Sequence, residues 1–182
     1  SQSVPVHEII VCDDGSTDGT REILATYAAD YTQIQLHFNE KNLGTVANMQ
    51  QCLRKTTGDL IFLADQDDVW LADKVERTLA FFQQHPHAAA VFSNADIIDE
   101  VGETQYGMTL WDIIGFPYEQ VELEDFERRV DNVVTGAGLA IKRDADLLQK
   151  DIPSLPGLLH DGWLGLYFAS QHRLIANPEK LF

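Results

Sequence analysis

The sequence has few cysteines, prolines and basic residues, and no long apolar run. Its two cysteines, Cys12 and Cys52, lack the spacing of a metal site and are expected to be small buried apolar residues. With 6 Pro and 45% hydrophobic residues the composition is that of a globular protein, which excludes disordered and fibrous classes. No stretch approaches the roughly 20 apolar residues of a membrane span. No signal segment opens the chain. We therefore expect a cytoplasmic protein, with membrane association only through parts not present here.

Basic residues are the largest shortage. The chain has 13 Lys and Arg against 29 Asp and Glu, which gives a formal net charge of −16. Such a surface repels a phosphate backbone and opposes adsorption to anionic lipid, so no nucleic-acid partner is expected. An acidic protein that handles a phosphorylated ligand needs a cation or local backbone donors.

Strand-like and helix-like segments alternate along the 182 residues. In the first predicted helix, Ile23, Leu24 and Tyr27 follow the helical spacing. Residues 99–118 show no clear period. The alternation predicts one α/β domain over residues 1–182, a mostly parallel sheet with helices on both faces. Strands are expected at 8–12, 34–38, 60–64, 88–92, 135–141 and 173–176, and helices at 20–31, 45–55, 71–85, 123–133 and 158–170.

Two of the predicted strands end in acidic turns, where ligands bind in open α/β sheets. Asp65-Gln66-Asp67-Asp68 follows the strand at 60–64. If the chain stays extended there, Asp65 and Asp67 share one face and offer the hard oxygens that Mg²⁺ or Mn²⁺ prefers. The alternative is a solvated acidic turn. Trp70, just beyond, is either a ligand wall or a packing residue.

The other acidic turn is Asp13-Asp14, at the end of the strand at 8–12. A carboxylate there could accept hydrogen bonds from a base N–H or from ribose hydroxyls, and nearby glycines give the backbone room. The alternative is a helix cap, with Ser16 or Thr17 before the helix at 20–31.

Five motifs together resemble glycosyltransferase family 2, which has the GT-A fold. Residues 8–20 are similar to its nucleotide-binding strand and turn, and Asn42-Leu43-Gly44 to its next loop. Residues 58–70, GDLIFLADQDDVW, resemble its metal-binding Asp-x-Asp strand. Residues 135–138, TGAG, and 160–163, HDGW, resemble its acceptor-side loop and the helix that carries its base.

The resemblance implies an inverting transfer from a nucleoside-diphosphate sugar to a saccharide or lipid-linked saccharide acceptor in polysaccharide biosynthesis. It makes Asp161 the catalytic base, with a Mg²⁺ or Mn²⁺ ion on the leaving diphosphate. The metal ligands are Asp65 and Asp67, and Asp67 is the more direct. The resemblance assigns the nucleotide-sugar contacts to Asp13, Asp14, Asn42, Gly44, Asp65, Gly136 and Gly138. It places Trp70 and Trp163 on the acceptor side.

The DQDDVW and HDGW variants are most similar to bacterial rhamnosyltransferases and related polysaccharide enzymes, which implies rhamnose as the sugar. The family's opening strand should precede Ser1, and a segment with a metal-liganding His should follow Phe182. We therefore expect a chain truncated at both ends.

Other interpretations stay open at this point. A nucleotidyltransferase also uses an α/β sheet and acidic metal ligands, but it usually carries a Gly-rich basic loop that is not visible here. A non-catalytic nucleotide-sugar-binding module needs no base, and an acidic domain could bind divalent cations without sugar chemistry. For single residues, Asp161 could be a helix N-terminal carboxylate, and Gly136 and Gly138 could serve tight strand packing.

Overall fold

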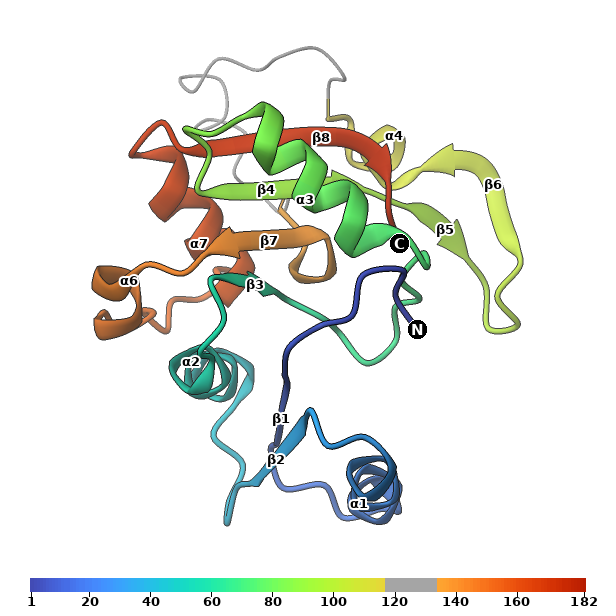
Figure 1. The fold of residues 1–182 in the computed structure, drawn as a ribbon, viewed down its shortest axis with the longest axis vertical. Helices are drawn as coiled ribbons and strands as arrows, with labels where there is room; N and C mark the ends of the chain where they lie inside the picture. Colours follow the sequence, from blue (N-terminus) through green and yellow to red (C-terminus); the bar gives the residue numbers. More distant parts are fainter. Residues whose placement is uncertain (117–133) are drawn as a thin grey trace. The chain divides into compact units, whose positions relative to one another are not determined.

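The computed structural model describes residues 1–116 and 134–182, which form two compact units. The four-stranded unit comprises Ser1–Val4, Phe62–Lys142 and Asp161–Phe182, and the two-stranded unit comprises Pro5–Ile61 and Arg143–His160. Each is described by itself (Figure 1). The helix predicted at 123–133 lies outside the described residues.

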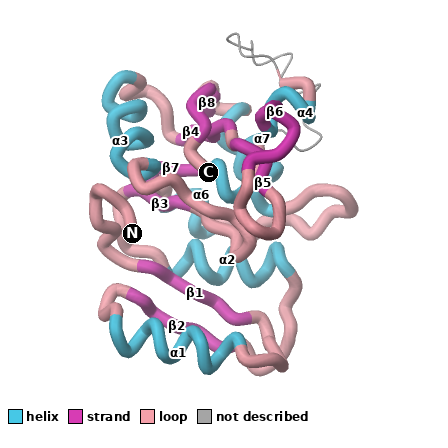
Figure 2. Tube along the Cα trace, turned by 90° about the vertical axis from the view of Figure 1, so that its right-hand side faces the viewer, coloured by secondary structure: helices cyan, strands magenta, loops and turns pink. Residues whose placement is uncertain are grey.

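The two-stranded unit is built on a parallel strand pair. β1 (Ile9–Asp13) pairs with β2 (Ile34–Phe38), and Ile9 lies opposite Ile34. Parallel neighbours need a crossover, and α1 (Thr20–Asp30) supplies it. α1 packs along β2, and α2 (Thr45–Lys55) packs along β1 (Figure 2). A short helix that the sequence did not predict, α6 (Ala145–Gln149), contacts α2.

The apolar residues at helical spacing in α1 are not buried. No residue of α1 is buried, and Ile23 and Tyr27 are 59% and 56% exposed. Tyr27 instead stacks on Tyr31, with ring centroids 6.3 Å apart. The helix packs along only a two-stranded pair, whose narrow surface covers little of it. Helical spacing of apolar residues is therefore a poor guide to burial here.

The sheet of the four-stranded unit has the order β3-β7-β4-β8. Its strands are β3 (Leu60–Phe62), β7 (Leu139–Lys142), β4 (Ala90–Asn94) and β8 (Leu174–Lys180). β4 runs parallel to β8 and antiparallel to β7. α3 (Lys74–Gln84) and α7 (His160–Ala169) cover opposite faces of this sheet (Figure 2). The predicted α/β architecture with helices on both faces is thus confirmed, with one antiparallel strand inside it.

The core of this unit forms around β4, which is buried along its whole length because it is a central strand. Phe92 is 2% exposed and packs against the rings of Trp111 and Phe116, with centroids 5.6 and 5.4 Å away. Burying a side chain of this size stabilises the fold by roughly 2–3 kcal/mol. Leu164 and Phe168 of α7 are fully buried as well, so that helix is anchored to the sheet.

The stretch that showed no period consists of short elements. β5 (Asp96–Ile98) pairs antiparallel with β6 (Thr104–Thr109), and α4 (Leu110–Ile114) follows directly. Thr109 and Asp112 form a reciprocal capping box at the start of α4. Elements of three to six residues are too short to display a repeat, which is why the sequence pattern was unreadable.

Among the helices that the structure describes, none is long and apolar enough to cross a membrane.

Candidate functional site

Asp14 organises the loop that follows β2. Its Oδ1 accepts hydrogen bonds from Asn39 Nδ2 and from the Leu43 N–H, and its Oδ2 accepts one from the Gly44 N–H, each at 2.8 Å. Asn42 Nδ2 donates to the Asp14 carbonyl oxygen at 3.1 Å. Three residues predicted to contact one ligand, Asp14, Asn42 and Gly44, therefore lie in direct contact with each other.

Desolvation acts to raise the pKa of Asp14, but the hydrogen bonds from Leu43, Asn39 and Gly44 outweigh it and hold the pKa below its ordinary value. The carboxylate is thus charged at neutral pH. Gly44 has a φ of 84°, a left-handed conformation that glycine adopts without strain. A charged side chain and a permissive glycine together fix the path of this loop.

Asp13 faces inward. It is 6% exposed, and its Oδ1 accepts a 2.7 Å hydrogen bond from Arg21 Nε and a 3.3 Å one from the Ser16 N–H. Burial acts to raise the pKa of Asp13, and the bonds from Ser16 and Arg21 lower it below the ordinary value. Because the Asp13 carboxylate accepts hydrogen bonds from Arg21 and Ser16, it stabilises the turn that follows β1.

Neither Ser16 nor Thr17 caps the following helix. α1 begins at Thr20, and Gly19 occupies the N-cap position without a side-chain cap. The helix-cap interpretation of this turn is therefore wrong. Asp18 Oδ1 accepts from the Thr20 N–H at 3.0 Å, which satisfies one donor of the first turn.

The acidic strand end in the four-stranded unit is a turn. β3 ends at Phe62 and the chain turns at Gln66 and Asp67, so the expectation that Asp65 and Asp67 share a face of an extended strand is wrong. An extended chain presents alternate side chains on one face, and the turn removes that alternation. Asp65 is half-buried, whereas Asp67 is exposed.

The carboxylates of this turn interact with one another. Desolvation, and then the charges of Asp65 and Asp67, raise the pKa of Asp68, while Lys74 acts to lower it. Oxygen ligands of this type fit Mg²⁺ or Mn²⁺, which usually keep several waters. Within residues 1–116 and 134–182, no group of three or more His, Cys, Asp or Glu side chains is arranged to hold an ion.

Lys74 was missed by the sequence reasoning. It is the first residue of α3 and is only 2% exposed, and its Nζ donates a 2.5 Å hydrogen bond to the Ala137 carbonyl oxygen. The same Nζ lies over the rings of Trp70, 4.6 Å from the centroid, and Phe182, 4.3 Å away. Burial lowers the pKa of Lys74 to about 7, and Asp68 acts in the opposite direction. The sequence offered one signal for a role of Lys74, which is its position six residues after Asp68 of the acidic cluster.

The predicted strand at 135–141 starts instead with a 3₁₀ turn, η1 (Gly136–Gly138), before β7. Asp161 stands in the first turn of α7. Its Oδ2 accepts from the Gly136 N–H at 3.0 Å, and its Oδ1 accepts from the Gly162 N–H at 2.7 Å. The candidate base and the small-residue loop are therefore joined directly.

Gly138 allows a close approach of chain segments. A Cβ at this position would lie 2.9 Å from the Ser93 carbonyl oxygen and 3.1 Å from both Phe182 Cε1 and Thr135 Oγ1. Tight packing against these atoms is sufficient to require a glycine at this position.

The two tryptophans assigned to the acceptor side are both half-buried. Trp70 packs on Phe62, with centroids 6.0 Å apart, and beneath the Lys74 amino group. Trp163 stacks on Tyr167 at 5.4 Å. Trp70 is thus half-buried between Phe62 and Lys74.

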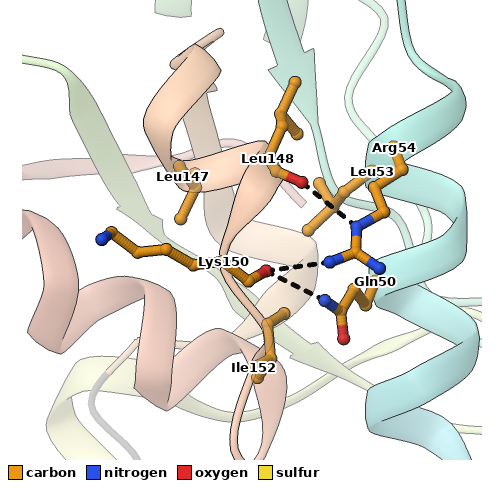
Figure 3. A pocket seen from close by; sticks show the side chains of 7 residues that line it. All are labelled: Gln50, Leu53, Arg54, Leu147, Leu148, Lys150 and Ile152. Atoms are coloured by element: carbon orange, nitrogen blue, oxygen red, sulfur yellow. Dashed lines mark hydrogen bonds between the residues drawn. The ribbon is translucent and has the colours of Figure 1, made fainter.

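A small pocket lies in the two-stranded unit, between α2 and the chain after α6 (Figure 3). Arg54 and Gln50 both reach into it and donate to the Lys150 carbonyl oxygen, at 3.2 and 2.9 Å. Its volume of about 10 Å³ holds at most one water. This pocket is too small for a nucleotide, and none of the predicted site residues lines it.

The model of the family described as Glycosyl transferase family 2 matches residues 1–147. The putative glycosyltransferase EpsE of Bacillus subtilis is 40% identical over 103 residues, 56% of this chain and 37% of that protein. The putative teichuronic acid biosynthesis glycosyltransferase TuaG of B. subtilis is 37% identical over 83 residues, 46% of this chain and 33% of that protein. The chain spans about a third of the length of these relatives.

Solved structures show the same fold. S. aureus TarS 1-349 in complex with UDP-GlcNAc superposes with a TM-score of 0.67 at 19% identity, over 99% of this chain and 50% of that one. The mannosyltransferase PcManGT from Pyrobaculum calidifontis, in complex with GDP-Man and Mn²⁺, superposes with a TM-score of 0.62 at 18% identity, over 98% of this chain and 48% of that one. The α/β fold is thus that of GT-A glycosyltransferases.

Proposed function

Because the chain belongs to glycosyl transferase family 2, we propose that the protein transfers a sugar from a nucleoside diphosphate to a saccharide or lipid-linked saccharide acceptor in polysaccharide biosynthesis. Two observations outside the chain support the substrate class: TarS was solved with UDP-GlcNAc, and PcManGT with GDP-Man. The name of TuaG points to polymer synthesis.

The donor nucleotide would bind at the loop that Asp14 organises. The side chain of Asp14 already holds the Leu43 and Gly44 N–H groups. In this proposal Asp14 holds the loop in place, and Asn42 and Gly44 contact the base and ribose of the nucleotide. Asp13 accepts a hydrogen bond from Arg21, which stabilises the turn beside the proposed nucleotide site.

Asp65 and Asp67 would hold a Mg²⁺ or Mn²⁺ ion together with the diphosphate of the donor. Carboxylate oxygens and a largely exposed turn suit an ion that shares its shell with water and phosphate. Such an ion neutralises charge on the departing diphosphate. In a protein with a net charge of −16, it also offsets repulsion between the protein and the anionic donor.

Asp161 is the proposed base of an inverting transfer, and its geometry carries the proposal. An ionised carboxylate offers about four lone-pair positions. Two of them are taken by the Gly136 and Gly162 N–H groups, so the carboxylate is fixed in orientation and can still accept a proton. It would take the proton of an acceptor hydroxyl as that oxygen attacks the anomeric carbon from the face opposite the leaving diphosphate.

The acceptor would lie near Asp161, with Trp163 two residues further along α7 and Trp70 at the border of the site. Gly136 and Gly138 keep the chain beside the sugar free of side chains. Rhamnose is the donor sugar that we propose, on the DQDDVW and HDGW motifs at 65–70 and 160–163.

The test is a thermal-shift panel on the full-length enzyme. Nucleoside diphosphates and their rhamnose, GlcNAc and mannose forms are compared with and without Mn²⁺. We expect one nucleotide to stabilise the protein strongly, more so with Mn²⁺ present, and its rhamnose form to do so best. A product assay then distinguishes the reaction, because a glycosyltransferase releases nucleoside diphosphate. Release of pyrophosphate would contradict the proposal and indicate a nucleotidyltransferase.

A further inference from the structure

Lys74 and Asp161 belong to helices on opposite faces of the four-stranded sheet (Figure 2). Both contact the same short turn, η1. Lys74 Nζ donates to the Ala137 carbonyl oxygen at 2.5 Å, and Asp161 Oδ2 accepts from the N–H of Gly136, the preceding residue, at 3.0 Å. One three-residue turn therefore links the start of α3 to the start of α7.

We propose that Lys74 is a positioning residue, which holds η1 in place and thereby sets the orientation of the Asp161 carboxylate. The inference rests on the proposed function in one respect, the assignment of Asp161 as the base. Lys74 itself touches neither the donor nor the acceptor in this scheme.

The surroundings of Lys74 restrict its amino group from several sides. Lysine is almost never fully buried unless it is paired. Here the pairing consists of the Ala137 carbonyl oxygen, the Trp70 and Phe182 rings, and the nearby carboxylate of Asp68. In its protonated form, an amino group over an aromatic face is attracted by the negative face of the ring. With this many contacts, the position of Nζ, and so of the Ala137 carbonyl, is well defined.

The turn is held at its end by β4, where Ser93 Oγ donates to the Gly138 carbonyl oxygen at 3.4 Å, and by its own bond from the Gly138 N–H to the Thr135 carbonyl oxygen at 3.1 Å. Its residues Gly136, Ala137 and Gly138 carry almost no side chain, so Lys74 holds Ala137 through the backbone. Loss of this anchor would let the Gly136–Ala137 part of the turn shift. A displacement of about 1 Å at a reacting group can cost about 10²-fold in rate.

Lys142 offers a matched control within the same unit. Its Nζ also donates to a backbone carbonyl, that of Pro86 at 3.0 Å, and lies over an aromatic ring, that of Phe82 at 5.4 Å. It is likewise at the end of an element, β7. It contacts neither η1 nor Asp161, so its replacement tests the loss of a carbonyl–lysine contact without the proposed linkage.

The experiment compares Lys74→Met, Lys74→Arg and Lys142→Met in the full-length enzyme. We expect Lys74→Met to lower kcat by about 10²-fold and Lys74→Arg by about tenfold, while the donor KM and the affinity for the nucleoside diphosphate change less than about threefold. Lys142→Met should leave all three unchanged. A residue with a purely structural role would change the yield of folded enzyme and leave kcat per folded molecule unaltered, and that result for Lys74 overturns the proposal.

Amide hydrogen exchange at Gly136 gives a readout that is independent of activity. Lys74→Met should speed exchange of this N–H by about tenfold, because its bond to Asp161 loosens when the turn shifts. Lys142→Met should not change it. Unchanged exchange in Lys74→Met contradicts the linkage. If Lys74→Met does not fold, Lys74→Arg decides by the same two readouts against Lys142→Arg.

The two proposals fail in different ways. If Asp161→Asn abolishes turnover and the Lys74 variants keep full kcat, the base assignment stands and the positioning role is wrong. If Asp161→Asn keeps turnover, the base assignment is wrong, and the positioning of a base by Lys74 falls with it, whatever the exchange data show.

Discussion

The carboxylate of Asp161 accepts a hydrogen bond from the Gly136 N–H, 25 positions earlier in the chain and 3.0 Å away. Together with the 2.7 Å bond from the Gly162 N–H, this contact fixes the carboxylate at the start of α7. Asparagine keeps the shape and one acceptor oxygen but cannot take a proton. Asp161→Asn should therefore lower kcat by about 10²–10⁴-fold and leave nucleotide-sugar affinity nearly intact.

Steady-state kinetics and isothermal titration with the donor check this prediction in the full-length enzyme. Asp151→Asn is a suitable control, because that carboxylate is 87% exposed and pairs with Arg54 and Gln50. Retained turnover in Asp161→Asn would remove Asp161 from the role of base.

Asp67→Ala should eliminate the metal dependence of nucleotide binding. The substitution removes a carboxylate from an exposed turn, so the fold should be unaffected. Calorimetric titration with the nucleoside diphosphate, with and without Mn²⁺, measures the effect. Asp73→Asn removes a charge six positions further on, from a side chain whose ion pair is with Arg77, and should behave as wild type. Unchanged Mn²⁺-dependent binding in Asp67→Ala shows that the metal ligands lie elsewhere.

Asp14→Ala should lower the free energy of unfolding by about 1–3 kcal/mol, because the Asn39 amide and the Leu43 and Gly44 N–H groups lose their acceptor. Its pKa lies below the ordinary 3.8, so the folded state binds fewer protons than the unfolded state near that pH. The stabilisation is therefore present above pH 3.8 and is lost as the pH falls through the folded-state pKa. Urea denaturation at neutral and acidic pH should show the difference between wild type and variant shrinking in acid. A constant difference would contradict it.

Lys74 should make stability depend on pH in the alkaline range. Burial lowers its pKa from 10.5 to about 7, so between these values the unfolded state binds more protons and stability rises with pH. The slope approaches about 1.4 kcal/mol per pH unit. Unfolding free energies of wild type and Lys74→Met at pH 7.5 and 9 isolate this contribution, and their difference should shift in favour of wild type at pH 9. A flat trend would show that the amino group keeps its ordinary pKa, and an opposite trend would show that folding raises it.

Local patterns predicted the regular elements well. The boundaries of β2 and α2 were predicted to the residue, because apolar side chains alternate in Ile34–Phe38 and follow the helical period in Thr45–Lys55. The motifs shared with the family also singled out Asp14 and Asp161, which bond to the loop at Leu43 and to Gly136. The prediction of a single domain over residues 1–182 stays a prediction, as do the roles of the site residues.

What the sequence could not supply were contacts between distant positions. The inward orientation of Asp13 depends on Arg21, and the burial of Lys74 depends on Ala137, 63 positions away. The turn at Gln66 depends on where the sheet ends, since Leu63 is the last residue there to bond to Leu139 of β7. Each of these is set by packing, for which neither propensity nor period carries a signal.

The reason for glycine at position 138 can be tested by adding one methyl group. A Cβ there would sit 2.9 Å from the Ser93 carbonyl oxygen, which belongs to β4 and cannot yield easily, so Gly138→Ala should cost about 1–3 kcal/mol of stability. Gly19→Ala is the control, because a Cβ there meets nothing within 4 Å and its φ of −75° suits any residue. Chemical denaturation of both variants gives the comparison. If Gly138→Ala is as stable as wild type but binds the donor sugar more weakly, the glycine serves the ligand rather than the packing of η1 against β4.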